Sequence, residues 1–285
     1  MARGERALRE ALAAVDLVWE VADARCPRAS RNPHLARLCA GKARVILLAK
    51  RDLAEHGSTA VWLAHLGAEA AAVACDLRGA AGLEALWPAS REAIRRAGVR
   101  RPGSEGYRAL VAGMPNTGKS TLLNRVLGVR RAAVGARPGI TRGPQWFRLP
   151  DGGRLLDLPG VLPLRLGAWP VAWRLWAIGA VGPEAVDPER AGAALVECIV
   201  RRSPGALKAR YGVDERPALA SEGEPPAPGD QGGPAVLDGI ARQRGLLAAG
   251  GVPDRSRAAT VLLAEFRRGL LGAVTLEDPP QAAPG

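Results

Sequence analysis

Lysine is scarce in this chain of 285 residues: only four of its 40 basic residues are lysines, and the others are arginines. Cysteine and histidine are also few. The four cysteines lie far apart, no Cys-x-x-Cys pair occurs, and the three histidines do not cluster with them, so the spacing expected of a zinc site is missing. Isolated thiols of this kind are typical of a reducing compartment.

Long apolar runs are missing as well. No run approaches the ~18 residues that a membrane-spanning helix needs, and the first residues lack the apolar region of a secretion signal. We therefore expect a cytoplasmic protein without a membrane partner. Hydrophobic residues at 47% and charged residues at 24% are ordinary values, which exclude a collagen, a disulfide mini-protein and a wholly disordered chain.

The charge of the chain is strongly positive. The formal net charge is +12 and the isoelectric point is near 10.8. Such a balance favours a polyanionic partner, most often nucleic acid. The alternative is an arginine-rich surface that reflects a biased genome and is only solvated.

Strand and helix patterns alternate in the first part of the chain. Apolar strand patterns cover 15–22, 44–49, 70–75 and 107–112, and helical patterns cover 5–14, 53–66, 80–97 and 119–127. A short strand pair is expected at 145–149 and 154–157. Continuously apolar strands that alternate with helices predict an α/β fold with a largely parallel sheet.

The second part of the chain reads as helical. Helices are expected at 168–182, 189–211, 236–249 and 254–268. We therefore predict an α/β domain over 1–167 and a small all-helical domain over 168–277, with a flexible loop at 214–234 and a disordered tail at 278–285. Three tryptophans at helical spacing, Trp169, Trp173 and Trp176, favour core packing over an RNA-stacking surface.

The strongest motif is Gly113-Met-Pro-Asn-Thr-Gly-Lys-Ser-Thr121, which fits the phosphate-binding P-loop pattern G-x-x-x-x-G-K-[ST]. An apolar strand precedes it and a helix pattern follows it, as a P-loop requires. Its backbone N–H groups and the N-terminus of the helix would bind phosphate oxygens. Lys119 would neutralise the β- and γ-phosphates as a catalytic residue, and Ser120 would bind Mg²⁺.

Two later segments fit the same phosphate chemistry. Asp157-Leu-Pro-Gly160 would place Asp157 near Mg²⁺ and the N–H of Gly160 near the γ-phosphate. Between this segment and the P-loop, Thr141 lies in a Gly/Pro-rich stretch. It could close over Mg²⁺ and the γ-phosphate as a catalytic switch residue, or the stretch could be an ordinary loop.

A base-reading segment precedes the P-loop. Ala49-Lys-Arg-Asp52 follows the apolar strand at 44–49. A carboxylate at Asp52 could accept two hydrogen bonds from the N1–H and N2–H₂ edge of guanine, an edge that adenine lacks. Lys50 could lay its stem over the base. The alternative is a charged strand end on the surface.

Together these residues resemble P-loop GTPases with the motifs in circularly permuted order, because the base-reading segment comes before the P-loop and the Asp157 segment comes last. Residues 16–33, which contain Asp-Ala-Arg-Cys-Pro, resemble the D-A-R-x-P stretch of the YlqF/RbgA family. Residues 263–277 resemble that family's terminal F-R-x-G-x-L-G-x-x-x-L-E. The resemblance covers about residues 5–277.

The resemblance implies a factor that binds and hydrolyses GTP in late assembly of the large ribosomal subunit and that binds rRNA through its helical domain. The implied cofactors are GTP and Mg²⁺, with K⁺ at Asn116 as an alternative to a simple loop hydrogen bond there. We expect a monomer. The implied nucleotide-binding residues are Lys50, Asp52, Cys75, Asn116, Thr117, Gly118, Lys119, Ser120, Thr121 and Gly160, and the implied Mg²⁺ ligands are Ser120, Thr141 and Asp157.

Three departures from the family pattern keep alternatives open. Ala49 stands where the family has Asn, a Ser-Ala pair is replaced around Cys75, and the family's N-terminal His has no counterpart because Met1 aligns with its Met. Val161 cannot orient a water molecule, so we expect slow intrinsic turnover that the ribosome accelerates. The alternatives are a non-catalytic guanine-nucleotide-dependent RNA-binding module and a GTPase that acts on another RNA.

Basic residues of the helical domain would make phosphate contacts without reading bases. The alternative for each is a solvated helix face. The expected contacts are Arg201, Arg202, Lys208, Arg210, Arg242, Arg244, Arg255, Arg257, Arg267 and Arg268, with a second patch at Arg25, Arg28 and Arg31.

Overall fold

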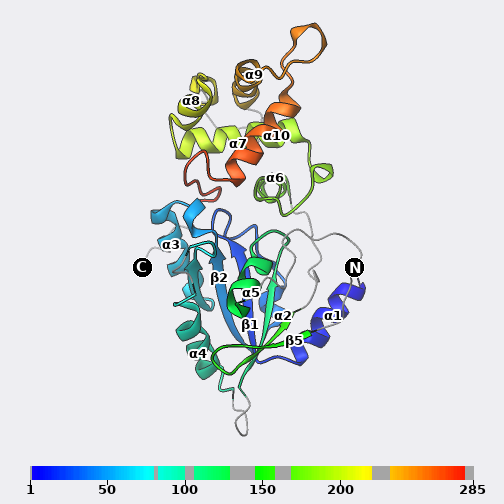
Figure 1. Cartoon of the computed structure of the whole chain (residues 1–285), viewed down its shortest axis with the longest axis vertical. Coiled ribbons are helices and arrows are strands. Elements are labelled where there is room, and N and C mark those ends of the chain that lie inside the picture. The colour runs from blue at the N-terminus through cyan, green and yellow to red at the C-terminus, as the bar shows by residue number, and fades with distance from the viewer. Residues whose placement is uncertain are drawn as a thin grey trace. The chain divides into compact units, whose positions relative to one another are not determined.

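The computed structural model describes residues 2–79, 83–99, 106–128, 145–157, 168–219 and 232–279. The chain divides into two compact units. One unit contains residues 1–165 together with 277–285, and the other contains residues 166–276. Each unit can be followed by its colours in Figure 1.

The first unit is built on a six-stranded sheet, which confirms the predicted α/β fold. Five strands run parallel, and β5 pairs antiparallel with β6 at one edge. The strands, in spatial order, are β3 (Ala71–Cys75), β2 (Ala43–Ala49), β1 (Leu17–Asp23), β4 (Arg108–Gly113), β6 (Arg154–Asp157) and β5 (Gln145–Arg148).

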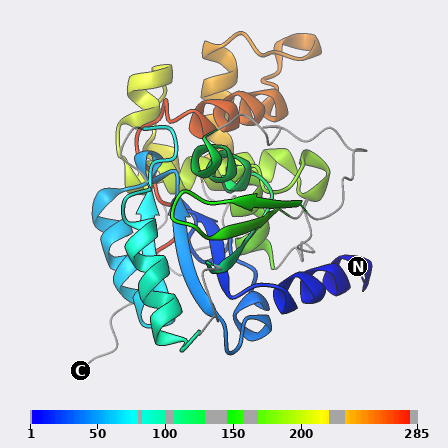
Figure 2. The ribbon, with the colours of Figure 1, turned by 60° about the horizontal axis from the view of Figure 1, so that its bottom comes forward.

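Every residue of β1 is buried, because β1 lies inside the sheet and both sheet faces are covered by helices. Side chains of a strand alternate between the two faces. Thus Leu17, Trp19 and Val21 pack toward the helices α4 (Leu86–Arg96) and α5 (Lys119–Leu127). Figure 2 shows this unit from a second direction.

The opposite face of the sheet is covered by three helices. Val18 packs with residues of α1 (Ala2–Ala13) and α2 (Leu35–Leu38). Ala22 packs with Trp62 of α3 (His56–Gly67). The sheet is therefore the middle layer of three, with helices packed against both of its faces.

The second unit is helical in the described residues. Its helices are α6 (Trp169–Ile178), α7 (Pro188–Arg202), α8 (Ala206–Tyr211), α9 (Gly233–Gln243) and α10 (Arg255–Arg267). Trp173 and Trp176 are buried, which confirms the predicted core packing for these two residues, whereas Trp169 is half-buried. None of the helices in the described ranges combines the length and hydrophobicity needed to cross a bilayer.

Two predicted helices are shorter than the sequence pattern suggested. The segment 189–211 is not one helix: α7 ends at Arg202, and α8 begins after Ser203-Pro204-Gly205, where Gly205 adopts a φ of +87°. Proline and a left-handed glycine stop a helix at such a point. Likewise α9 ends at Gln243, and the chain then forms a small hairpin closed by the bridge between Leu247 and Pro253.

Candidate nucleotide-binding site

The parallel strands bring the predicted motifs to one edge of the sheet. The carboxyl ends of parallel strands meet at the same edge, which is where ligands bind in open α/β sheets. Lys50 and Asp52 follow β2, Cys75 ends β3, the P-loop follows β4, and Asp157 ends β6. Asp23 ends β1, between β2 and β4.

The P-loop, residues 113–121, passes close to the strand beside it. A Cβ atom at Gly113 would lie 2.3 Å from the carbonyl oxygen of Val21, so only glycine fits there. Gly118 adopts a φ of +115° at the N-terminus of α5, and a Cβ atom there would lie 3.2 Å from the Cβ of Ala49. The loop is therefore packed against the ends of both β1 and β2.

The side chains of the loop converge on one carbonyl group. The Nζ atom of Lys119 donates to the carbonyl oxygen of Met114 at 2.5 Å, and the hydroxyl of Thr117 donates to the same oxygen at 2.9 Å. Burial lowers the pKa of Lys119 to about 8. Thr117 is buried, whereas Asn116 is exposed and Ser120 and Thr121 are half-buried.

Lys50 connects the end of β2 to the P-loop. Its Nζ atom donates to the carbonyl oxygen of Asn116 at 2.7 Å and to Oδ2 of Asp23 at 2.8 Å. The non-glycine residues with positive φ in the described ranges are Lys50, at 60°, and Asn116, at 57°. Such backbone strain concentrates at functional sites, and here it marks both ends of one hydrogen bond.

Asp23 and Arg25 form a buried ion pair behind Lys50. The guanidinium of Arg25 donates from Nε and Nη2 to the two carboxylate oxygens of Asp23, at 2.9 and 2.8 Å. Burial alone would raise the pKa of Asp23, but Arg25 and Lys50 lower it to about 2. Burial alone would lower the pKa of Arg25, but Asp23 and, more weakly, Asp52 raise it.

Asp52 and Cys75 occupy the neighbouring strand ends. Asp52 is exposed on the short 3-10 helix η1 (Arg51–Leu53), while Cys75 is buried and pairs in register with Ala49. Burial raises the pKa of the Cys75 thiol to about 11, so the thiol stays neutral. Because Cys75 is only 1% exposed, its main chain is the part available to a ligand beside Asp52.

Two predicted site residues, Thr141 and Gly160, lie outside the described residues. Asp157 is described as the last residue of β6, where its main chain pairs with Gln145.

The prediction of a second basic patch at Arg25, Arg28 and Arg31 is wrong for Arg25 and Arg31. Arg25 is 1% exposed within its ion pair, and Arg31 binds Glu20 and Glu69. Arg28 is exposed and lies over the ring of Trp62. A guanidinium already paired and buried cannot reach an RNA phosphate.

The predicted basic residues of the helical unit likewise divide into those with partners inside the protein and those that are exposed. Arg210 and Arg244 bind Glu265, and Arg267 donates to the last carbonyl groups of α6, so these three have internal partners. Exposed side chains remain at Arg201, Lys208, Arg242, Arg257 and Arg268, and Arg202 is half-buried.

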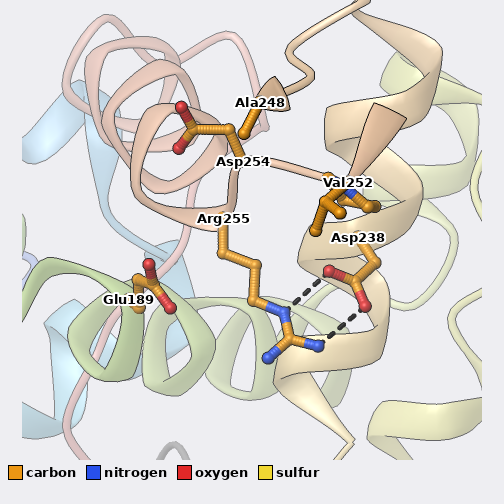
Figure 3. Close-up of a pocket in the computed structure, with 7 residues that line it drawn as sticks. Glu189, Asp238, Ala248, Val252, Asp254 and Arg255 are labelled. Carbon is orange, nitrogen blue, oxygen red and sulfur yellow. Dashed lines mark hydrogen bonds and ion pairs between the residues drawn. The ribbon is translucent and has the colours of Figure 1, made fainter. Parts of the chain in front are cut away.

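A pocket of about 400 Å³ in the helical unit lies near the hairpin before α10 (Figure 3). Three of its polar side chains are engaged within the protein. Arg255 pairs with both carboxylate oxygens of Asp238 at 2.7 and 2.8 Å, and Asp254 accepts the N–H of Arg257 as the N-cap of α10. The pocket is therefore held by a contact between α9 and α10, and Arg255 is used in that contact.

Sequence reasoning missed Asp23 and Arg25 as parts of the nucleotide site. Both lie in the Asp-Ala-Arg-Cys-Pro stretch, where the sequence analysis gave Asp23 no role and assigned Arg25 only to a second basic patch. The signal available was an acidic residue at the end of a largely apolar strand, adjacent in sheet order to the base-reading strand.

The chain is similar to known GTPases of ribosome biogenesis. A family model described as a 50S ribosome-binding GTPase matches residues 108–180. The chain is 31% identical over 290 residues to the ribosome biogenesis GTPase A of Priestia megaterium, covering 99% of this chain and 96% of that protein. It is 30% identical over 284 residues to the protein of that name from Thermotoga maritima, covering 99% and 93%.

Solved structures give the same answer for the fold. The GNP-bound YlqF from T. maritima is similar with a TM-score of 0.64 and 26% identity, covering 97% of this chain and 98% of that one. A GDP-bound YlqF structure is similar with a TM-score of 0.63, covering 95% and 98%.

Proposed function

Because the chain belongs to the ribosome biogenesis GTPase A family, it is a GTPase of ribosome biogenesis, and we propose that it acts in late assembly of the large ribosomal subunit. In this proposal the α/β unit binds and hydrolyses GTP, and the helical unit binds rRNA. With this circularly permuted motif order, base recognition and phosphate recognition would both take place at one edge of the sheet.

Asp52 is the base-reading residue of this proposal. Its carboxylate would accept hydrogen bonds from N1–H and N2–H₂ of guanine, while the stem of Lys50 covers the base. The observation that supports this most strongly is the 2.7 Å bond from Lys50 Nζ to Asn116 O, because it sets the base-reading segment directly against the P-loop. Main-chain N–H groups beside Cys75 would complete the base pocket.

The P-loop would hold the triphosphate. Its main-chain amides and the N-terminus of α5 favour anions, and Lys119 would leave the Met114 carbonyl to bind the β- and γ-phosphates. A hydroxyl at Ser120 and a carboxylate at Asp157 are oxygen ligands that suit Mg²⁺, and both follow adjacent parallel strands. Thr141 would be the third protein ligand, and Asn116 would hold K⁺.

Bound Mg²⁺ would neutralise charge that develops on the phosphates. Position 161, directly after Asp157-Leu-Pro-Gly160, carries Val, which has no group to orient a water molecule. Intrinsic hydrolysis is therefore slow in this proposal, and the ribosomal subunit accelerates it.

Competition among GTP, ATP and XTP tests the base-reading proposal. Wild-type protein should prefer GTP over both competitors. Asp52→Asn exchanges an acceptor for a donor, so it should shift preference toward XTP. An unchanged order of affinities in Asp52→Asn would remove Asp52 from the base-reading role.

Co-sedimentation with large ribosomal subunits tests the partner. Binding should be stronger with a non-hydrolysable GTP analogue than with GDP, and added subunits should raise the rate of phosphate release. Equal binding in both nucleotide states, or binding to small subunits instead, would count against this role.

A further inference from the structure

The carboxylate of Asp23 has no assigned role, yet it is the most enclosed charged group at the nucleotide edge of the sheet. Asp23 is 0% exposed and Arg25 is 1% exposed. Burying charges is costly unless they are paired, so a buried ion pair at a ligand site requires a reason beyond stability.

The Asp23–Arg25 pair is linked to the P-loop through hydrogen bonds of Lys50. Oδ2 of Asp23 accepts hydrogen bonds from both Arg25 Nη2 and Lys50 Nζ, each at 2.8 Å. Lys50 then donates to the Asn116 carbonyl at 2.7 Å. A continuous line of short hydrogen bonds thus runs from the core of the sheet, through Lys50, to the P-loop.

The main chain requires this support. Lys50 is held at φ 60° and ψ 40°, a left-handed conformation that costs a non-glycine residue free energy. The residue before it, Ala49, has no polar side-chain group that could bind the P-loop, although its Cβ packs close to Gly118. The strained end of β2 is therefore held in place through the Nζ atom of Lys50.

The loop that carries the pair is itself fixed. The main-chain N–H of Asp23 donates to the hydroxyl of Ser30 at 2.8 Å. The N–H groups of Arg28 and Ala29 donate to the carboxylate of Glu277, at 2.7 and 3.0 Å. Asp23 is thus presented from a rigid support rather than from a free loop.

We propose that Asp23, oriented by Arg25, is a positioning residue of the nucleotide site: it holds Lys50 in the conformation that covers the base and braces the P-loop. This inference rests on the proposed base-reading role of the Lys50–Asp52 segment. The chemistry does not distinguish guanine from xanthine, because Asp23 acts through Lys50 and not on the base edge.

Asp23→Asn tests the inference, because it removes the charge and keeps the size. Affinity for GTP, GDP and XTP should fall by about tenfold each, mainly through faster dissociation, while the ratio of GTP to XTP affinity stays at the wild-type value. Fluorescent-nucleotide dissociation and competition measure both quantities.

Glu20→Gln is the matched control. Glu20 lies on the same strand, is 1% exposed, and binds Arg31 and Arg44, so its variant should lose stability without losing nucleotide affinity. A purely structural role for Asp23 predicts that both variants behave alike, with melting temperatures lowered and dissociation constants unchanged at temperatures well below melting. That result would overturn the proposal.

Two further variants cover the risk that Asp23→Asn does not fold. The double variant Asp23→Asn/Arg25→Met removes the buried pair as a unit, and it should show the same loss of affinity; wild-type affinity would refute the proposal. Lys50→Met should reproduce the loss, and adding Asp23→Asn to it should weaken binding no further. Additive losses would show that Asp23 does not act through Lys50.

The outcomes separate this inference from the proposed function. Failure of Asp52→Asn to change base preference counts against base reading by Asp52. Wild-type nucleotide affinity in Asp23→Asn counts only against positioning.

Discussion

At the scale of single residues, the charge state of Asp23 is set by its neighbours. Burial alone would raise the pKa of this carboxyl, but Arg25 and Lys50 lower it to about 2. The residue is therefore ionised at neutral pH in the folded protein, and its ionisation is linked to folding.

This linkage gives a pH dependence with a definite sign. Because the folded-state pKa is below the unfolded value near 4, the ionised pair stabilises the fold above about pH 4, and this contribution is lost as pH falls toward 2. The difference in pKa corresponds to roughly 2–3 kcal/mol. Urea unfolding of the wild type between pH 2 and 6 should show this extra slope.

Asp23→Asn is the comparison for that slope. The variant lacks the carboxyl, so its unfolding free energy should change less with pH over the same window. Parallel pH profiles for the two proteins would show that the pKa of Asp23 is the same in the folded and unfolded states.

At the scale of elements, Glu215 determines how the helical unit turns after α7. Its carboxylate accepts N–H groups from Gly205 at 2.6 Å, Leu207 at 2.7 Å and Lys208 at 2.9 Å. These groups lie at the N-terminus of α8, where backbone donors have no partner within the helix. A side chain from outside the helix thus takes the place of an N-cap residue.

Glu215→Ala should therefore destabilise the helical unit by about 1–3 kcal/mol, because it leaves half-buried donors without their acceptor. Thermal unfolding followed by circular dichroism measures this loss. Glu184→Ala, at an exposed position of the same unit, should leave the melting temperature within a degree or two. Equal melting temperatures for Glu215→Ala and the wild type would show that the cap contributes nothing.

The same elements show how much of the fold could be predicted from the sequence. Apolar periodicity predicted the strands of the sheet, and the P-loop helix was predicted at 119–127, where α5 begins and ends. Those features depend on local pattern. The break before α8 was missed although Pro204 and Gly205 give a local signal for it. The acceptor that caps α8 could not be predicted, because Glu215 lies ten residues from Gly205 and periodicity carries no information on such a partner.

The candidate site likewise has one part that could be predicted from the local sequence and one part that could not. The P-loop and the Lys50–Asp52 segment were identifiable because their backbone geometry demands particular residues at fixed spacing. The residues that support these two segments could not be identified from the sequence. Asp23 meets Lys50 across 27 residues, and Glu277 meets Arg28 across 249, and only the folded sheet brings these groups together.

At the scale of the whole molecule, the number of basic residues, 40, overstates how many of them are available to a partner. Many arginines are used inside the protein: Arg25 binds Asp23, Arg255 binds Asp238, and Arg210 binds Glu265. A basic composition therefore does not by itself identify an RNA-binding surface. In the helical unit, the candidates are the basic side chains that remain exposed.

Salt dependence distinguishes the exposed residues from the paired ones. A contact between a basic side chain and an RNA phosphate contributes about 0.7–0.9 to the slope of log affinity against log salt concentration. Replacing Arg201, Lys208 and Arg242 together by Gln should therefore reduce the slope for large-subunit rRNA by about 2, and weaken binding at low salt. Arg216→Gln is the control, because Arg216 is exposed but pairs with Asp214 at 2.7 Å; its slope should equal that of the wild type. If the triple variant keeps the wild-type slope, RNA does not contact these three residues.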